Sequence, residues 1–136
     1  MRIIHGEHSG RRIHIPKNLR ARPTTDQARE SLFNILYNRV EFSELKVLDL
    51  FAGTGSISYE FASLGCPDIV SIDNDRFHVA AIQKNCDDVG LSAIRAIKSD
   101  VFKYIKYPGR KFDLIFADPP YDLKDLSEIP DKILNS

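Results

Sequence analysis

The chain has few of the features that mark disulfide-rich, metal-binding or membrane proteins. Its 136 residues include two cysteines, Cys66 and Cys86, which are too few and too isolated for a disulfide framework or a zinc site. We therefore expect two reduced thiols in a cytoplasmic protein that holds no metal. No stretch approaches the roughly 18 apolar residues that a membrane helix needs, and the first residues lack the apolar core of a signal peptide. We expect no membrane association.

The charged residues are distributed unevenly along the chain. Apolar residues make up 43% and charged residues 28% of the sequence, which is typical of one globular domain. The formal net charge is zero, but residues 1–40 contain eight Lys/Arg and three Asp/Glu and so carry +5, while residues 41–136 carry −5. This asymmetry predicts an arm that binds a polyanion, attached to a body with another role. The alternative is an exposed arm whose charges only keep it soluble.

The first 23 residues form this arm. Residues 2–4 and 11–15 are β-prone and flank a segment rich in turn-forming residues, which predicts a small hairpin. A loop follows over residues 16–23. Thr24 and Gln27 match a capping box, and apolar residues at four-residue spacing predict a helix that continues to about Val40. We therefore divide the chain into a basic hairpin and loop at 1–23 and a main domain at 24–136.

From residue 46 onward, predicted strands and helices alternate. Strands are expected at 47–51, 68–73, 94–99 and 112–117, and helices at 56–64, 75–89 and 123–134. The helix at 75–89 is expected to bury Phe77, Ala80, Ala81 and Ile82. Apolar strands that alternate with helices predict an α/β fold with a doubly wound, mainly parallel sheet covered on both faces. Ligands of such folds bind beyond the carboxyl ends of the strands.

Polar residues follow the first two strands at these ends. Gly53 and Gly55 permit a sharp turn and a close backbone approach, with a purely structural turn as the alternative. The turn departs from the dinucleotide-binding fingerprint because Ser58 stands where that fingerprint has its third glycine. Asp73 can accept both hydroxyls of a ribose. Its alternative role is a helix N-terminal acid that complements the dipole, which Asp75 fits better.

Polar residues also follow the last two strands. Asp100 can accept a hydrogen bond from an exocyclic amine, or it can cap a helix. Asp118 begins an acid-Pro-Pro-Tyr sequence in which an acid, carbonyl oxygens fixed by two prolines and an aromatic ring share one corner. A proline-rich turn without function would not explain the acid and the ring on either side. The histidines are expected to be surface groups or phosphate contacts: His5, His8, His14 and His78.

Several of these motifs are similar to those of a known family. Residues 49–55 resemble motif I of class I S-adenosylmethionine-dependent methyltransferases, and residues 118–121 resemble the (D/N)PP(Y/F) motif of those that methylate exocyclic amino groups. Residues 2–6, 10–12, 22–26 and 32–36 resemble the start of the RsmD family. The resemblance implies a Rossmann-like fold and the cofactor S-adenosylmethionine. It also implies methyl transfer to N2 of a guanine in 16S rRNA, either free or in an assembling small ribosomal subunit.

The resemblance also implies roles for individual residues. The amino-acid end of the cofactor would be held by Asp49 and by the backbone of the turn, namely Phe51, Ala52, Gly53 and Gly55. The adenosine end would be held by Asp73 at the ribose, Asn74 against the adenine, and Asp100 with the Val101 amide at the adenine edge. The target base would be held by Asp118, Pro119, Pro120 and Tyr121. On the arm, phosphates would be bound by Arg2, His5, Arg11, Arg12, Arg20 and Arg22.

Other functions remain open at this point. A DNA or protein amine methyltransferase would have the same motif at residues 118–121. Family members usually continue for several tens of residues past that motif, so we expect the C-terminal part of the sheet to be missing. A non-catalytic RNA-binding fragment is therefore another alternative. An NAD-dependent oxidoreductase would use the glycines and Asp73 in a similar way but would leave residues 118–121 unexplained. We expect the protein to be a monomer.

Overall fold

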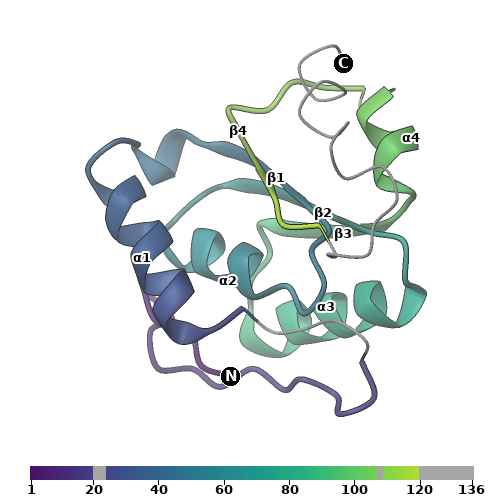
Figure 1. Cartoon of the computed structure of the whole chain (residues 1–136). Coiled ribbons are helices and arrows are strands. Elements are labelled where there is room, and N and C mark those ends of the chain that lie inside the picture. Colours follow the sequence, from purple (N-terminus) through teal and green to yellow (C-terminus); the bar gives the residue numbers. More distant parts are fainter. Residues whose placement is uncertain (20–23, 107–108, 120–136) are drawn as a thin grey trace.

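The computed structural model describes residues 1–19, 24–106 and 109–119. Four strands form one parallel sheet in the order β3-β2-β1-β4 (Figure 1). The strands are β1 (Lys46–Leu50), β2 (Asp68–Asp73), β3 (Ile94–Lys98) and β4 (Leu114–Ala117). The chain builds outward from β1 to β3 and then returns to place β4 on the other side of β1. This reversal confirms a doubly wound sheet, with its topological switch point between β1 and β4.

The strand register brings the four carboxyl ends to one edge of the sheet. Leu50 pairs with Ile72 of β2 and with Ala117 of β4, and Ile72 pairs with Ile97 of β3. The residue after each of these positions therefore lies near the same edge. This is the edge at which the sequence predicts the ligand site.

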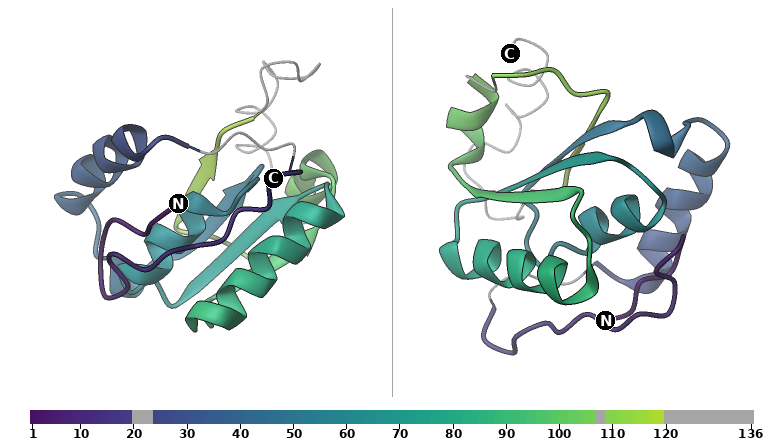
Figure 2. Two further views of the ribbon diagram at one scale, coloured as in Figure 1. Left: turned by 90° about the horizontal axis from the view of Figure 1, so that it is seen from below. Right: turned by 180° about the vertical axis from the view of Figure 1, so that it is seen from behind.

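Helices cover both faces of the sheet, as the two views in Figure 2 show. One face carries α1 (Asp26–Tyr37), α2 (Ser56–Ser63) and α3 (Arg76–Val89), and its core includes Val47 and Ile69 from the strands. The other face carries α4 (Val101–Lys106), which packs on Leu48 and Val70. Adjacent residues of β1 thus point to opposite faces and both are buried, as expected of a strand covered on both sides. A short 3₁₀ helix, Phe42–Glu44, precedes β1.

The N-terminal segment packs on the domain without forming the predicted hairpin strands. A single antiparallel bridge joins Arg2 and Arg12, and no strand is assigned among residues 1–19. Ile3 and Ile13 are buried in the core cluster that contains α2 and α3. Asn85 of α3 donates from Nδ2 to the His14 carbonyl at 2.9 Å. The segment therefore runs across the helices of this face (Figure 2), and local β propensity was too weak to form a regular ladder.

Several predicted element boundaries need correction. The cap of α1 is Thr25, whose Oγ1 accepts from the Ala28 N–H, so the predicted capping box was placed one residue early. The helix ends at Tyr37, before Val40. The short helix α4 was not predicted, because six residues carry too little periodicity to be recognised. Most strands begin or end one or two residues inside their predicted limits, and the predicted helix at 123–134 lies outside the described residues.

The buried face of α3 also differs from the prediction. Phe77 is 60% exposed and Ala80 is exposed, whereas the predicted Ile82 is buried. The helix instead buries residues at positions i, i+4, i+7 and i+8, namely His78, Ile82, Asn85 and Cys86. The prediction failed because two of these residues are polar and were not counted as part of a buried face.

Both cysteines are free and buried, as expected of reduced thiols. Burial raises the pKa of the Cys66 and Cys86 thiols to about 12, so both remain protonated at neutral pH. Among the described residues, no helix has the length and apolar character needed to cross a bilayer.

Candidate active site

The segment between β1 and α2 is a tight turn built from left-handed residues. Phe51 has φ 57°, Gly53 φ 58° and Gly55 φ 84°. A positive φ is unfavourable for a side chain such as that of Phe51, so the surrounding structure must impose it. The Ala52 N–H donates to the Ile72 carbonyl at 2.9 Å and the Gly55 N–H to the Ala52 carbonyl at 2.8 Å. These bonds hold the turn against β2.

Gly55 also explains how the turn joins the following helix. It is the N-cap of α2 and provides no side-chain cap, so the first amides of the helix have no side-chain acceptor from the cap residue. A Cβ atom on Gly55 would lie 2.8 Å from Tyr59 Cζ and 2.9 Å from Ile82 Cγ1. The glycine is therefore required by packing inside the protein as well as by its backbone conformation.

Asp49 belongs to β1, its side chain contacts α2, and it is 1% exposed. Ser58 Oγ donates to Asp49 Oδ2 at 2.6 Å and also lies 2.6 Å from Ser71 Oγ. A hydroxyl has one hydrogen, so Ser71 donates to Ser58 while Ser58 donates to Asp49. Ser58, which was noted only as a missing glycine, is thus the hydrogen-bond partner of the buried acid.

Burial raises the pKa of Asp49 to about 7, and the Ser58 hydrogen bond opposes this shift. The negative charges of Asp73 and Asp118 contribute to this raised pKa. Two carboxylates from the ends of β2 and β4 therefore lie within electrostatic reach of Asp49. Such a site favours a ligand that brings positive charge or hydrogen-bond donors.

Asp73 at the end of β2 connects the turn to α3. Its Oδ2 accepts from the Gly53 N–H at 2.9 Å, and its Oδ1 accepts from the Asp75 N–H at 2.9 Å. His78 Nδ1 lies 3.0 Å from the same Oδ1. Asp75 caps α3 by accepting from two backbone N–H groups, which agrees with the helix N-terminal role that the sequence favoured for it. Asn74, between the two acids, is exposed.

The remaining strand ends contribute Asp100 and Asp118. Asp100 Oδ1 accepts from the Lys103 N–H at 3.1 Å, so this residue caps α4. Val101 starts that helix with its side chain buried. Asp118 is exposed directly after β4, and Pro119 beside it is half-buried. Pro120 and Tyr121 lie outside the described residues.

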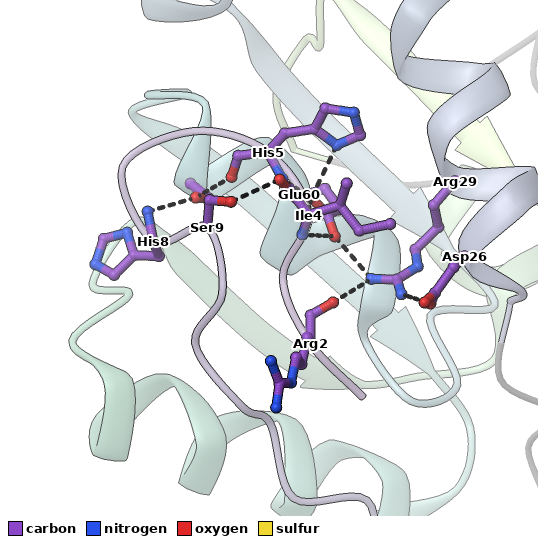
Figure 3. A network of polar contacts seen from close by, with 9 residues as sticks. Arg2, Ile4, His5, His8, Ser9, Asp26, Arg29 and Glu60 are labelled. Atoms are coloured by element: carbon purple, nitrogen blue, oxygen red, sulfur yellow. Dashed lines mark hydrogen bonds and ion pairs between the residues drawn. The ribbon is translucent and has the colours of Figure 1, made fainter.

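A buried network of charged groups attaches the N-terminal segment to the domain, as Figure 3 shows. Glu60 of α2 is fully buried and accepts from the Ile4 and His5 N–H groups at 3.0 and 2.9 Å. Arg29 of α1 is 1% exposed; it donates to Glu60 Oε2 at 2.7 Å and to the Arg2 carbonyl at 3.1 Å, and it pairs with Asp26. The sequence did not reveal this role of Arg29, which was counted only among the eight basic residues of positions 1–40.

Ser63 of α2 fixes the next part of the segment. Its Oγ donates to the His5 carbonyl at 2.5 Å and accepts from the His8 N–H at 2.8 Å. A Cβ on Gly6, whose φ is 78°, would lie 2.0 Å from the Ser63 carbonyl oxygen, so only glycine fits there. The segment is therefore held rigidly by α2, the helix that begins at the glycine turn.

The predicted phosphate-binding residues differ in accessibility. Arg2, Arg11 and Arg12 are exposed, whereas Arg20 and Arg22 lie outside the described residues. His5 contacts Glu60 through Nδ1 at 3.1 Å and retains 13% of its side-chain exposure. The surface role expected for the histidines is wrong for His78, which is buried against Asp73.

Two further observations concern the rest of the described residues. A surface hollow lined by Lys46, Asp68 and Arg95 lies at the opposite, amino-terminal edge of the strands. Residues 1–19, 24–106 and 109–119 contain no group of three or more His, Cys, Asp or Glu side chains arranged to hold a metal ion.

The sequence of the chain matches one known family over its whole length. Residues 1–136 match the family described as conserved hypothetical protein 95. The chain belongs to this family, the RsmD family. Ribosomal RNA small subunit methyltransferase D of Escherichia coli K12 is 31% identical to the chain over 121 residues, which covers 89% of the chain and 60% of that relative. The chain thus spans about 60% of the length of this RsmD relative.

Solved structures of other proteins share the fold of the chain. The Escherichia coli protein yhhF, a proposed methyltransferase, has a TM-score of 0.87 and 30% identity, covering 99% of the chain and 72% of yhhF. SMU.776, a proposed methyltransferase crystallised with SAH, shares the fold at a TM-score of 0.65 and 24% identity, covering 79% of the chain and 31% of SMU.776. The cofactor of the family is S-adenosylmethionine, as the resemblance implied.

Proposed function

We propose that the chain is the donor-binding and catalytic part of an rRNA methyltransferase that uses S-adenosylmethionine to methylate N2 of a guanine in 16S rRNA. The observation that carries this proposal is the group of acids at the glycine turn: Asp73 accepts from the Gly53 N–H, and the charges of Asp73 and Asp118 both act on the buried Asp49. The name of the Escherichia coli relative supports an rRNA substrate.

The buried acid fits the amino-acid end of the donor. Asp49 is a desolvated carboxyl whose pKa of about 7 reflects its burial and two negative neighbours, so a nearby cation would stabilise its ionised form. S-adenosylmethionine brings an ammonium group and a sulfonium group. We assign the backbone of Phe51, Ala52, Gly53 and Gly55 to the same end, since the turn has the left-handed geometry that lets a ligand approach the main chain.

We assign the adenosine end to the ends of β2 and β3. A carboxylate offers about four acceptor positions, and three N–H groups already occupy three of those on Asp73 if His78 donates. Asp73 therefore has room for about one ribose hydroxyl, and binding two requires that one existing bond be shared. Asn74 is exposed beside it and would lie against the adenine. Asp100 and the Val101 amide would bind the adenine edge.

The target amine would be bound by Asp118 and its neighbours. The lone pair of guanine N2 is delocalised into the ring, so the amine is a poor nucleophile. The Asp118 carboxylate and the Pro119 carbonyl would accept its two hydrogens and favour a pyramidal nitrogen with a free lone pair. We assign Pro120 to fixing this backbone and Tyr121 to stacking on the extruded base.

The bound donor supplies an electrophilic methyl group on a positively charged sulfur. As nitrogen forms its bond to this carbon, the carbon–sulfur bond breaks and the nitrogen must lose one proton. Asp118 would receive that proton, because in this arrangement it accepts a hydrogen bond from the amine. Positioning of this kind supplies roughly 7–11 kcal/mol in favourable cases, so the role of these residues is mainly to orient the two reactants.

We assign RNA binding to the N-terminal segment at 1–23 and catalysis to residues 24–136. Arg2, Arg11 and Arg12 are exposed on a segment that α2 holds rigidly, which suits binding to phosphates. His5, Arg20 and Arg22 complete the proposed RNA contacts. The substrate would be 16S rRNA or an assembling small ribosomal subunit, and the enzyme a cytoplasmic monomer.

The test measures donor binding and methyl transfer separately. Calorimetry of the purified chain with SAH and with NAD compares the two cofactor classes. We expect SAH to bind and NAD not to bind. Labelled methyl transfer is then measured on small ribosomal subunits, naked 16S rRNA, duplex DNA and protein. Nucleoside analysis of methylated RNA should reveal N2-methylguanosine. Transfer to DNA or protein alone would refute the rRNA substrate, and SAH binding without transfer to any of these would identify a non-catalytic fragment.

A further inference from the structure

His78 is a buried polar residue at the start of α3 that none of the roles assigned above requires. It is 7% exposed, and its Nδ1 lies 3.0 Å from Asp73 Oδ1. An ionised carboxylate can only accept, so Nδ1 must carry the hydrogen of this bond. The imidazole therefore donates to Asp73, the last residue of β2.

The same carboxylate reaches the glycine turn through its other oxygen. Asp73 Oδ2 accepts from the Gly53 N–H at 2.9 Å, while Oδ1 also accepts from the Asp75 N–H at 2.9 Å. Two donors on Oδ1 fix the plane of the carboxylate, and the plane in turn directs Oδ2 toward Gly53. His78 thus lies one hydrogen bond beyond the contact that holds the turn.

Packing alone does not account for a histidine at this position. The Nε2 atom of His78 is buried and has no hydrogen-bond partner among the described residues. It lies 3.7 Å from Asp75 Oδ2, which is within ion-pair distance but too far for a hydrogen bond. A buried polar atom without a partner costs stability. An apolar side chain of similar volume would fill the space without this cost, so the Nδ1 contact is the gain that offsets it.

We propose that His78 is a positioning residue for donor binding, which acts through Asp73 to hold the Gly53 turn in its binding geometry. This inference rests on the proposed function in that the turn is taken to bind S-adenosylmethionine. His78 itself contacts Asp73 and needs no contact with the donor. Its effect should therefore be visible in the turn of the free protein and in the affinity for the donor.

The test uses three substitutions of His78. In His78→Asn the amide nitrogen replaces Nδ1, so the bond to Asp73 is retained. In His78→Gln the nitrogen lies one carbon further from the backbone, near the former Nε2, and His78→Leu has no donor. Gln83→Leu, at an exposed position on the same helix, is the control for an added apolar side chain.

The first measurement is amide hydrogen exchange with ¹⁵N-glycine labelling, which resolves Gly53 among the seven glycines. We expect faster exchange at Gly53 in the leucine and glutamine variants and wild-type exchange in the asparagine variant and the control. The second is calorimetry with SAH. We expect the dissociation constant to rise about tenfold in the leucine and glutamine variants, as for the loss of one charged hydrogen bond, and to stay near wild type in the asparagine variant.

Rescue by asparagine separates positioning from a general effect on the helix. If His78→Asn behaves like His78→Leu, or if all three variants match the wild type, the inference is wrong. Should the leucine variant fail to fold, the comparison of asparagine with glutamine decides the question. If the wild type does not bind SAH, the proposed function fails, whereas the exchange of Gly53 still decides whether His78 holds the turn.

Discussion

Replacement of Asp49 by asparagine should make the protein more stable at neutral pH. The Asp49 carboxyl is 1% exposed, and burial raises its pKa from 3.8 to about 7. An asparagine oxygen can still accept the hydrogen bond from Ser58, so the substitution removes the charge and leaves the local geometry intact. The variant therefore isolates the free-energy cost of ionising a buried acid.

The sign of the effect follows from proton binding. Between the pKa of the unfolded chain, about 3.9, and that of the folded protein, about 7, the folded state binds the proton of Asp49 more tightly. The contribution of Asp49 to stability is therefore fully present below the lower pKa and is lost as the pH rises to 7. At about 1.4 kcal/mol for each pKa unit, the total loss is at most about 4 kcal/mol.

Urea unfolding of wild type and Asp49→Asn at pH 5, 6, 7 and 8 measures this loss. The difference in unfolding free energy should grow in favour of the variant by about 2 kcal/mol between pH 5 and 7 and level off by pH 8. Asp88→Asn removes an exposed carboxylate from α3 and serves as the control. A difference between Asp49→Asn and wild type that stays constant over pH 5–8 would refute the reasoning.

Three further substitutions test the proposed site and the attached segment. Asp118→Ala should abolish methyl transfer while calorimetry still detects SAH binding, with Asp88→Ala as the control; equal transfer by the variant would exclude the proposed role of Asp118. Replacing Arg11 and Arg12 by alanine should weaken RNA binding and reduce its dependence on salt concentration, measured by filter binding from low to physiological salt, because fewer phosphates are neutralised; an unchanged affinity at every salt concentration would contradict this. Glu60→Gln removes the negative charge that pairs with the buried Arg29 guanidinium, so urea unfolding should show that the free energy of unfolding falls by about 3 kcal/mol. A decrease well under 1 kcal/mol would mean that the network contributes little to stability.

Much of the fold was predictable because it depends on short-range patterns. The strands at 68–73 and 94–98 and the helices after β1 and β2 follow from apolar runs and from capping residues. The sequence also favoured Asp75 over Asp73 as the acid at the start of α3, and the hydrogen bonds of Asp75 to the α3 amides confirm this. Such assignments need only a few neighbouring residues.

Predictions that required knowledge of distant contacts failed more often. Phe77 was expected in the core because it is apolar, but the inward face of α3 is occupied by His78, which bonds to Asp73. Arg29 was counted only as one of the basic residues of positions 1–40, although it is buried against Glu60, 31 positions further along the chain. Neither contact leaves a periodic signal in the sequence.

The amino-acid sequence by itself determined the alternation of strands and helices, the glycine turn and the acid-Pro-Pro-Tyr motif, because each depends on backbone preferences over a few residues. Only the tertiary structure decided which acids face one another, which of them is buried, and how the N-terminal segment attaches to α2. Burial of a charged group is favourable only where the fold supplies its partners, and here the partners of Glu60 and Asp73 come from segments that are distant in the sequence or lie on another element.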